Sequence, residues 1–591
     1  MHSKLVIITL TLLALSAGCV QAKPFALAQA AQQQQRPAQQ RQKFIPVDGA
    51  DLRTKFETAA RLARSTQPST PYWTAYSFDV RPGVAVDPSV QMFSGSMENF
   101  SGMTIFMGRS GGVTVETRNL AVFLLRDPAA NAITRVEVYN LEREREYGGY
   151  PVYFLERGSN EESLNLLRGL AESGRDQRIV EHAIVAIALH DDQRVAALLK
   201  NFARASASDD DTRGAAIFWL GQVGGEQNFL ADIVRNDQEH TELRRNAAYA
   251  IGVGREPNVL QLLQSLYDTV ANPEVKRGLI HAVSINDNRE AVIAFLLKIA
   301  RSDPDRESRQ QAIHWLGQRG GESVIDDLMK IYETERDRDV KSHVLHALYE
   351  IDSPRATARL LSIARGGDDT EIRGQAIHWL GQKGESVLDD LMKIFAAESN
   401  REIKGRVLHA LYEMNTQRSR AALLTVARNP AEDAEVRTQA IHWLGELGGD
   451  AMIDELMNIF NSERNTEVRG GVLHAFSKMD SPRAEAKLFE IARRSDDQQS
   501  RGQAIHWLGQ RAGERSLRML ASTINSSSED TEIQAQALHA ISQRPRDEAI
   551  PLLIRIARTH PNPEVRRQAI HWLGQTGDER ALEFFRELLS R

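Results

Sequence analysis

The chain has 591 residues, of which 42% are hydrophobic and 26% charged, and its formal net charge at pH 7 is −6. Its 73 Lys and Arg residues are balanced by 79 Asp and Glu residues, so the charge argues against a nucleic-acid-binding protein. Cys19 is the only cysteine, which excludes internal disulfides and cysteine metal sites from the rest of the chain.

Residues 1–22 resemble an export signal. Lys4 precedes an apolar run from Leu5 to Leu15, and Val20-Gln21-Ala22 suits cleavage before residue 23. The run is shorter than the roughly 20 apolar residues that span a bilayer, so no membrane span is expected here. Cys19 at the end of Ser-Ala-Gly-Cys offers a competing interpretation, a lipid anchor. The sequence therefore predicts an exported bacterial protein, periplasmic or secreted, with a lipoprotein as the variant.

Two segments precede the repeats. Residues 23–44 are rich in glutamine and favour a disordered tether. Residues 45–160 predict a small β-rich module with one helix and no catalytic motif, which would cap the exposed end of the repeats. We expect its helix at Asp51–Ser65 and its strands at Tyr72–Val80, Val113–Asp127, Ala132–Glu142 and Pro151–Glu156. A hairpin turn is expected at 127–131, and the aromatic side chains expected in its core are Tyr72, Trp73, Tyr76 and Phe78.

The rest of the chain is repetitive. The octapeptide Gln-Ala-Ile-His-Trp-Leu-Gly-Gln occurs at 311–318, 375–382, 503–510 and 568–575, and at 439–446 with Glu446 as its last residue. Sister blocks with a histidine in the same place lie midway between these copies, so the unit is 31 to 33 residues long. Including Val185, Phe218 and Tyr249 in the histidine slot gives thirteen units. A period in the thirties with helical spacing indicates an α-solenoid of helix pairs.

One copy shows why each unit is two helices. Asn562 is a suitable N-cap and Pro563 a suitable first helical residue. Gly577 ends the first helix, and the second apolar stripe begins at Ala581. On the first helix the histidine slot points away from the apolar stripe.

The pattern Glu-Val-Arg-x-x-Ala-x-x-x-Leu-Gly-x-x-Gly-Asp at Glu564–Asp578 resembles the HEAT repeat in its short, phycobilisome-lyase-like form. The resemblance covers roughly 161–591 and implies an armadillo-type superhelix whose motif-bearing helices line the concave face. We therefore expect an all-α solenoid of about thirteen HEAT-like helix pairs, preceded by the small β-rich (α+β) module. Fold alone does not fix function, because such solenoids host scaffolds, inhibitors and some enzymes.

Two further features recur at fixed slots. A basic residue lies five positions before the histidine slot in eleven of the thirteen units, and we interpret this series as structural. Tryptophan follows the histidine in every octapeptide copy, where this repeat type usually has a small residue. We interpret it as a buried wedge that sets the spacing of alternate repeats.

Histidine fills its slot in ten consecutive units, which we call the histidine ladder. Recent duplication of a 64-residue segment would explain it, and so would use as a polar binding strip for an extended peptide or a glycan. In the second case acidification toward pH 5 would add up to roughly ten positive charges to the strip. The residues of the predicted strip are His281, His314, His346, His378, His409, His442, His474, His506, His539, His571, Gln311, Gln375, Gln439, Gln503 and Gln568.

The sequence predicts no metal or cofactor. Histidines on neighbouring helices converge poorly on one ion, no carboxylate recurs directly beside them, and His343 with His346 is the one locally spaced pair. Deoxyhypusine hydroxylase, an enzyme of HEAT repeats, binds iron through His-Glu pairs, and this chain contains no His-Glu dipeptide. The resemblance to phycobilin lyases is at the level of the repeat.

These observations favour a non-enzymatic, exported scaffold that binds a protein or peptide on the concave face. The alternative is an envelope enzyme, or a metal-dependent oxidoreductase or lyase-like protein, with its activity in residues 45–160 or on the ladder. A purely structural envelope scaffold is a third interpretation.

Overall fold

A computed structural model gives the structure of the chain. It describes residues 44–82, 84–87, 104–107, 119–141, 147–173, 176–205, 209–254, 256–366, 369–510, 514–526 and 530–590. The predicted signal, Cys19, nearly all of the predicted tether and residues 113–118 lie outside these ranges. The chain divides into two compact units, Met1–Ala312 and Ile313–Arg591, and we describe each by itself.

The first unit begins with a five-stranded mixed sheet in the order β1-β7-β2-β5-β6. Strand β2 pairs antiparallel with β5 and parallel with β7, and β5 pairs antiparallel with β6 through the predicted hairpin turn. Strands β3 and β4 form a separate antiparallel pair. The strands are β1 (Ile45–Pro46), β2 (Tyr72–Ser77), β3 (Val84–Asp87), β4 (Thr104–Met107), β5 (Leu120–Asp127), β6 (Ala132–Asn140) and β7 (Val152–Arg157). The sequence pattern found the four long strands and missed the three short ones.

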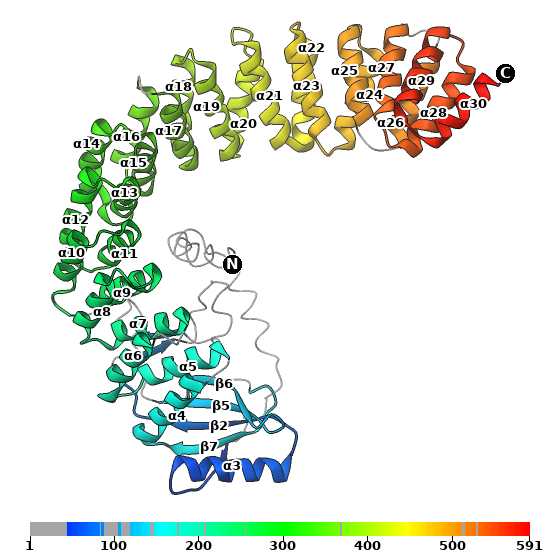
Figure 1. Ribbon diagram of the computed structural model, residues 1–591. Helices are drawn as coiled ribbons and strands as arrows, with labels where there is room; N and C mark the ends of the chain where they lie inside the picture. The colour runs from blue at the N-terminus through cyan, green and yellow to red at the C-terminus, as the bar shows by residue number, and fades with distance from the viewer. Residues whose placement is uncertain are drawn as a thin grey trace, which may run out of the picture. The chain divides into compact units, whose positions relative to one another are not determined.

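The sheet is buried on both faces, because successive side chains of a strand point to opposite sides. Trp73 and Phe123 lie in a buried aromatic cluster on one face. On the other face, Tyr76 contacts the ring of Phe56 in helix α3 (Leu52–Thr66), and the four predicted core aromatics are all buried. Figure 1 shows α3 beside β7 at the margin of the sheet.

Helix α4 (Asn160–Ser173) follows the sheet, and then come thirteen successive helix pairs within the described residues, as predicted. We call the helix that carries the histidine slot the first helix of its pair. The first helices are α5 (Gln177–Ala188), α7 (Asp210–Val223), α9 (Thr241–Val253), α11 (Pro273–Ser284), α13 (Arg306–Gly320), α15 (Arg338–Glu350), α17 (Thr370–Gln382), α19 (Arg401–Met414), α21 (Ala434–Gly448), α23 (Thr466–Lys478), α25 (Gln498–Gln510), α27 (Thr531–Ser542) and α29 (Pro563–Thr576).

The second helices alternate with them along the chain. They are α6 (Arg194–Arg204), α8 (Gln227–Arg235), α10 (Val259–Thr269), α12 (Arg289–Ser302), α14 (Ile325–Thr334), α16 (Pro354–Arg365), α18 (Leu388–Ala397), α20 (Gln417–Arg428), α22 (Ile453–Ser462), α24 (Pro482–Arg494), α26 (Glu514–Asn525), α28 (Arg546–Thr559) and α30 (Glu579–Leu589). Within each unit, first helices pack against first helices of neighbouring pairs, and Figure 1 shows them side by side in chain order. No helix within the described residues is both long and apolar enough to cross a membrane.

The recurrent basic residue is structural, as predicted. Arg373 donates from Nε to the carbonyl of Ala364 at 3.0 Å, and Arg437 donates in the same way to Ala427 at 3.1 Å. These carbonyls end the second helix of the preceding pair, where backbone acceptors lack helical partners. The guanidinium of Arg437 also pairs with Glu463, beyond the end of the following second helix. Arg437 therefore ties its first helix both to the second helix of the preceding pair and to the second helix of its own pair.

The glycine of each octapeptide except the last permits a close approach of consecutive first helices. A Cβ atom on Gly381 would lie 2.8 Å from the Cβ of Ala410, and one on Gly445 would lie 2.8 Å from that of Ala475. Real Cβ atoms do not approach so closely, so any side chain at the glycine would push the helices apart.

The β-rich module is joined to the first helices through a buried histidine, His190. Its ring stacks on Phe78 at 4.1 Å, its Nδ1 lies 2.7 Å from the Ala186 carbonyl, and its Nε2 lies 2.7 Å from Ser163 Oγ. Because a carbonyl only accepts, Nδ1 donates; the neutral ring then accepts from Ser163, whose oxygen accepts from Tyr76. Burial lowers the pKa of His190 to about 4, although the Ala186 carbonyl and Asp192 oppose this shift.

The glycine contact can be tested by adding one methyl group. Gly509→Ala would place a Cβ 2.5 Å from that of Ala540, and we expect the free energy of unfolding to fall by about 1–3 kcal/mol. Gly574→Ala is the matched control, because Gly574 fills the same slot in the last repeat and an added Cβ would meet only Phe585, at 4.0 Å. There the gain in helix propensity should raise stability by about 0.5–1 kcal/mol. Equal shifts of the urea midpoint for the two variants would show that the contact between Gly509 and Ala540 does not limit helix packing.

The buried histidine predicts acid sensitivity of the first unit. The unfolded chain protonates His190 near pH 6.5 while the folded chain does so near 4, so stability is lost as the pH falls through that window, by up to about 3 kcal/mol. Urea unfolding of wild type and of His190→Gln between pH 7.5 and 4.5 measures this effect. The difference in free energy of unfolding between wild type and His190→Gln should shrink toward acid pH. A difference that stays constant would show that His190 does not titrate as described.

Candidate binding groove on the histidine ladder

The structure places every ladder histidine at the surface of its first helix. Nine of the ten side chains are partly buried and His571 is exposed. The exposed fractions of His346, His378 and His409 are 29%, 44% and 42%. The apolar residues on either side of the slot are buried instead, as with Ile377 and Leu380 around His378. The slot therefore points away from the core, as the sequence predicted.

Ring contacts connect the ladder across neighbouring helices. The rings of His314 and His346 stack at 6.0 Å, and those of His442 and His474 also stack at 6.0 Å. His314 lies three residues before Gly317, and His346 lies directly before Ala347, the residue that Gly317 contacts. The second pair has the same arrangement around Gly445 and Ala475. The glycine contact thus brings the two helices close enough for these rings to stack. In the first unit the same slot continues as Phe218, Tyr249 and His281, whose rings also stack.

The tryptophans are not buried wedges, which corrects the prediction. Trp379, Trp443, Trp507 and Trp572 are each partly exposed. Each contacts the histidine of the preceding first helix, as with Trp379 and His346 at 4.7 Å or Trp507 and His474 at 4.8 Å. The indole therefore does fill the gap between alternate repeats, but it does so at the surface, where it stays partly exposed.

Carboxylates do lie beside the histidines, contrary to the sequence-based expectation. His346 Nε2 lies 3.3 Å from Glu350, and Glu413 lies 3.2 Å from His378 and 3.8 Å from His409. Both glutamates follow a histidine by four residues, a helical spacing that places the side chains on one face. That spacing was the available signal. Within the described residues, no group of three or more His, Cys, Asp or Glu side chains has the geometry to hold a metal ion.

The half-buried setting changes the acid-base behaviour of several ladder histidines. Burial lowers the pKa of His314, His346 and His474 below the usual value, and neighbouring histidines lower it further. Glu350 opposes the shift at His346, and Glu446 opposes it at His474. Burial and the charge of Arg245 likewise lower the pKa of His281. These four positions therefore gain their charge at a lower pH than free histidine does.

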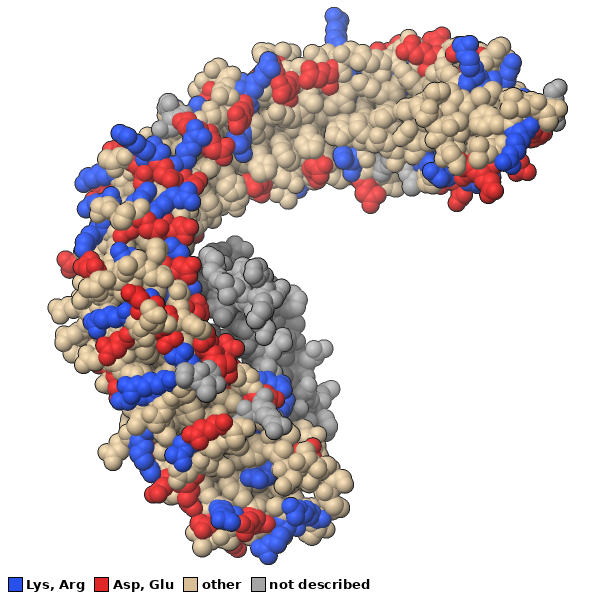
Figure 2. Space-filling view, viewed as in Figure 1, with Lys and Arg blue, Asp and Glu red and all other residues tan. Residues whose placement is uncertain are grey.

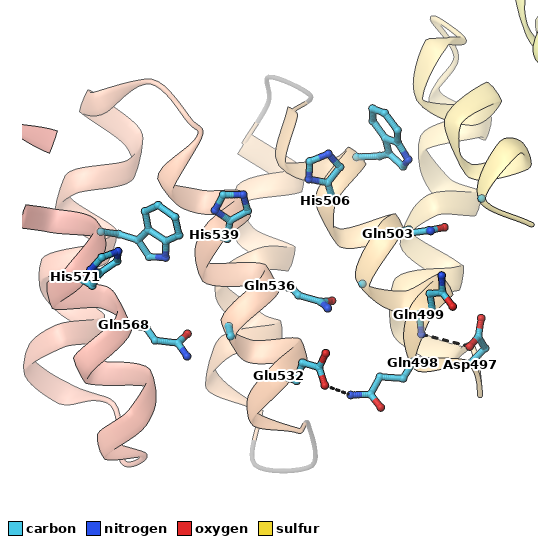
Figure 3. Close-up of a pocket in the computed structure, with 15 residues that line it drawn as sticks. Asp497, Gln498, Gln499, Gln503, His506, Glu532, Gln536, His539, Gln568 and His571 are labelled. Carbon is cyan, nitrogen blue, oxygen red and sulfur yellow. Dashed lines mark hydrogen bonds between the residues drawn. The ribbon is translucent and has the colours of Figure 1, made fainter. Parts of the chain in front are cut away.

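The C-terminal part of the ladder lines a groove of about 1130 Å³ across α25, α27 and α29, which we call the ladder groove (Figure 3). It brings together five residues of the predicted strip: His506, His539, His571, Gln503 and Gln568. The other ladder histidines lie on their own first helices outside the groove. Gln375 instead accepts a hydrogen bond from Ser342 at 2.5 Å, on the neighbouring first helix.

Gln536 was missed by the sequence prediction. It lies three residues before His539, the slot that Gln503 and Gln568 occupy on the flanking helices. The Gln-Ala-Leu-His block at 536–539 was the available signal, but its lack of tryptophan set it apart from the octapeptides. In the sister blocks of α15, α19 and α23 this slot holds His343, Arg406 and Gly471 instead, so three consecutive first helices carry both glutamine and histidine only within the groove.

Small residues shape the floor of the groove. Gly470 and Gly502 line it one position before the glutamine slot, and each lies under the amide of the next helix. A Cβ on Gly470 would come within 3.0 Å of the Gln503 amide oxygen. The amides therefore lean over a flat floor instead of projecting freely into solvent.

Comparison with known proteins agrees with the repeat assignment. A family model of HEAT repeats matches residues 293–381, 388–477, 422–509, 485–558 and 517–591. No curated protein matches the sequence. Among solved structures, yeast importin-beta (Kap95p) is 12% identical over 71% of this chain and 67% of its own, with a TM-score of 0.31. Human deoxyhypusine hydroxylase is 15% identical over 43% of this chain and 95% of its own, with a TM-score of 0.20.

A homology model of the AP-3 complex is also similar, with 14% identity over 69% of this chain and 80% of the matched chain and a TM-score of 0.29. Such low identities and TM-scores carry no argument about function. The chemistry of the ladder must therefore be assessed from this chain's own residues.

The carboxylate beside His346 provides a test of the ladder's electrostatics. Removing the charge in Glu350→Gln should lower the pKa of His346 further, because this glutamate favours the protonated ring. Histidine ¹³Cε1 NMR titration of the full chain measures it. The pKa of His474 is the internal control, since Glu446 is its carboxylate neighbour and is untouched. A raised or unchanged pKa at His346 would contradict the assigned contact.

Proposed function

The chain belongs to the HEAT-repeat family, and from this premise we propose that it is an exported scaffold that binds a protein or peptide partner along the histidine ladder. The face that carries the ladder is the one we expect to be concave. The single observation that carries the proposal is the ladder groove, where the predicted histidines and amides converge on one open hollow.

The chemistry of the ladder face suits a polypeptide ligand. Partly exposed tryptophan rings supply contact area at low entropic cost, and glutamine and histidine side chains both donate and accept hydrogen bonds. A mixed surface of this kind is typical of protein interfaces, which combine aromatic anchors with polar groups. Figure 2 shows acidic and basic side chains interspersed over the visible face, with no large basic area that would attract nucleic acid.

Export is part of the proposal and rests on residues 1–22. The short apolar run after Lys4 and the small residue at Ala22 support a cleaved signal, and Cys19 supports a lipid anchor as its variant. A tethered or free solenoid outside the cytoplasm would present its ladder to envelope proteins.

Site-directed photo-crosslinking tests where a partner binds. In a Cys19→Ser background the chain has no other cysteine, so Gln536→Cys or Arg555→Cys gives a single thiol for a benzophenone maleimide. Gln536 lines the groove, whereas Arg555 is exposed on the second helix α28 and serves as the matched control. In envelope extract of the parent organism we expect one discrete adduct, identified by mass spectrometry, from position 536 and none from position 555. Adducts from position 555 alone, or from neither position, would overturn the proposed ladder-face binding.

A further inference from the structure

Two parallel rows of side chains run across the ladder groove. Gln503, Gln536 and Gln568 form one row, and the histidines three residues later on the same helices form the other (Figure 3). Residues three apart on a helix lie on one face with Cβ atoms about 5–6 Å apart. Neighbouring helices pack about 8–10 Å apart, so three of them present each row over about 18 Å.

The central helix of the groove holds two polar atoms whose hydrogen-bonding capacity is not met. Gln536 Oε1 and His539 Nδ1 are both buried, and neither has a hydrogen-bond partner among the described residues. A buried polar atom without a partner costs about 1–3 kcal/mol. Both side chains line the groove, but these two atoms are themselves covered, and Gln536 Oε1 lies against Gly502 of α25.

The charge of the groove is negative. Among the described residues that line it, none is Lys or Arg, while Asp497 and Glu532 are acidic. Asp497 is already compensated, because Ser500 donates to it and Arg469 lies 3.5 Å away. Among the described residues, the side-chain amide of Gln498 donates a hydrogen bond to the Glu532 carboxylate at 3.0 Å. The charge of Glu532 is thus left for a ligand cation.

We propose that the ladder groove binds an extended peptide whose main chain crosses α25, α27 and α29 and which carries a Lys or Arg side chain toward Glu532. This inference rests on the proposed function and names the class of partner. An extended chain rises about 3.3 Å per residue, so about six residues span the groove. Its N–H and C=O groups alternate along both edges, which matches amides on one side and imidazoles on the other. The rings of Trp507 and Trp572 directly follow His506 and His571, so they lie along the histidine side of the groove, away from Glu532.

Three blocked octapeptides serve as probes, with alternating Lys-Gly, Ser-Gly and Glu-Gly sequences. Cellohexaose tests whether the groove binds a carbohydrate instead. Isothermal titration of the full chain should show the Lys-Gly peptide binding at least tenfold more tightly than the Ser-Gly peptide, and the Glu-Gly peptide more weakly than either. Glu532→Gln should bring the Lys-Gly and Ser-Gly affinities within about twofold of each other, because the carboxylate supplies the preference.

Glu467→Gln is the matched control, since Glu467 occupies the same slot on α23 and does not line the groove. It should leave the preference for the Lys-Gly peptide intact. Gln536→Met, of similar size, should weaken both peptides by roughly tenfold, because its amide serves the main chain and not the cation. Thermal midpoints of all three variants establish that each is folded.

Three outcomes would overturn the inference: equal loss of the lysine preference in both glutamate variants, tighter binding of cellohexaose than of any peptide, or no binding of any probe at millimolar concentration. Any of these together with a crosslinked partner at position 536 would leave the proposed function standing without its peptide class. Peptide binding as expected, with no crosslinked partner, would instead count against the proposed function alone.

Discussion

The contact on which the ladder depends is the one between the glycine of one first helix and the alanine of the next. Gly381 meets Ala410 and Gly509 meets Ala540, at distances that leave no room for a side chain on the glycine. Each contact lies within three residues of a ladder histidine on both helices, and at Gly317 and Gly445 the flanking histidine rings stack. A solenoid has no long-range core, so the geometry of every neighbouring pair must be set locally.

The alternation of two kinds of interface follows from this contact. Where a glycine meets an alanine, as between α17 and α19, two first helices pack closely. At the adjacent interface, between α15 and α17, the indole of Trp379 fills the space and contacts both His346 and Tyr349. Arginines of the recurrent basic series connect each first helix to the preceding pair, because they donate to carbonyls at the ends of second helices. The 64-residue sequence period thus corresponds to two successive packing interfaces of different kinds.

Partial burial gives the ladder its chemical character. The slot points away from the core, yet neighbouring rings cover enough of each imidazole to lower the pKa of His314, His346 and His474. Neutral imidazoles both donate and accept hydrogen bonds, which suits polar recognition better than a row of fixed positive charges. The groove across α25, α27 and α29 adds a second row of amides and the carboxylate of Glu532, which accepts from Gln498.

The sequence by itself determined the repeat, its period, the two-helix unit and the outward direction of the histidine slot, because these follow from spacing along a single helix. It also identified the four long strands and the buried aromatics of the small sheet, where alternation and turn residues are local signals. The recurrent arginine was assigned a structural role correctly, since its slot at the edge of the apolar stripe is likewise a property of one helix.

Only the tertiary structure decided what depends on neighbouring helices. The tryptophan slot appeared buried on its own helix, but the preceding histidine and not the core covers the indole of Trp379. Glu413 joins His378 across two helices, and the groove forms only where Gln503, Gln536 and Gln568 fall in line. The periodicity of one helix indicates which side of it faces inward, whereas the distance and register between helices come from contacts such as Gly509 with Ala540, which no single repeat reveals.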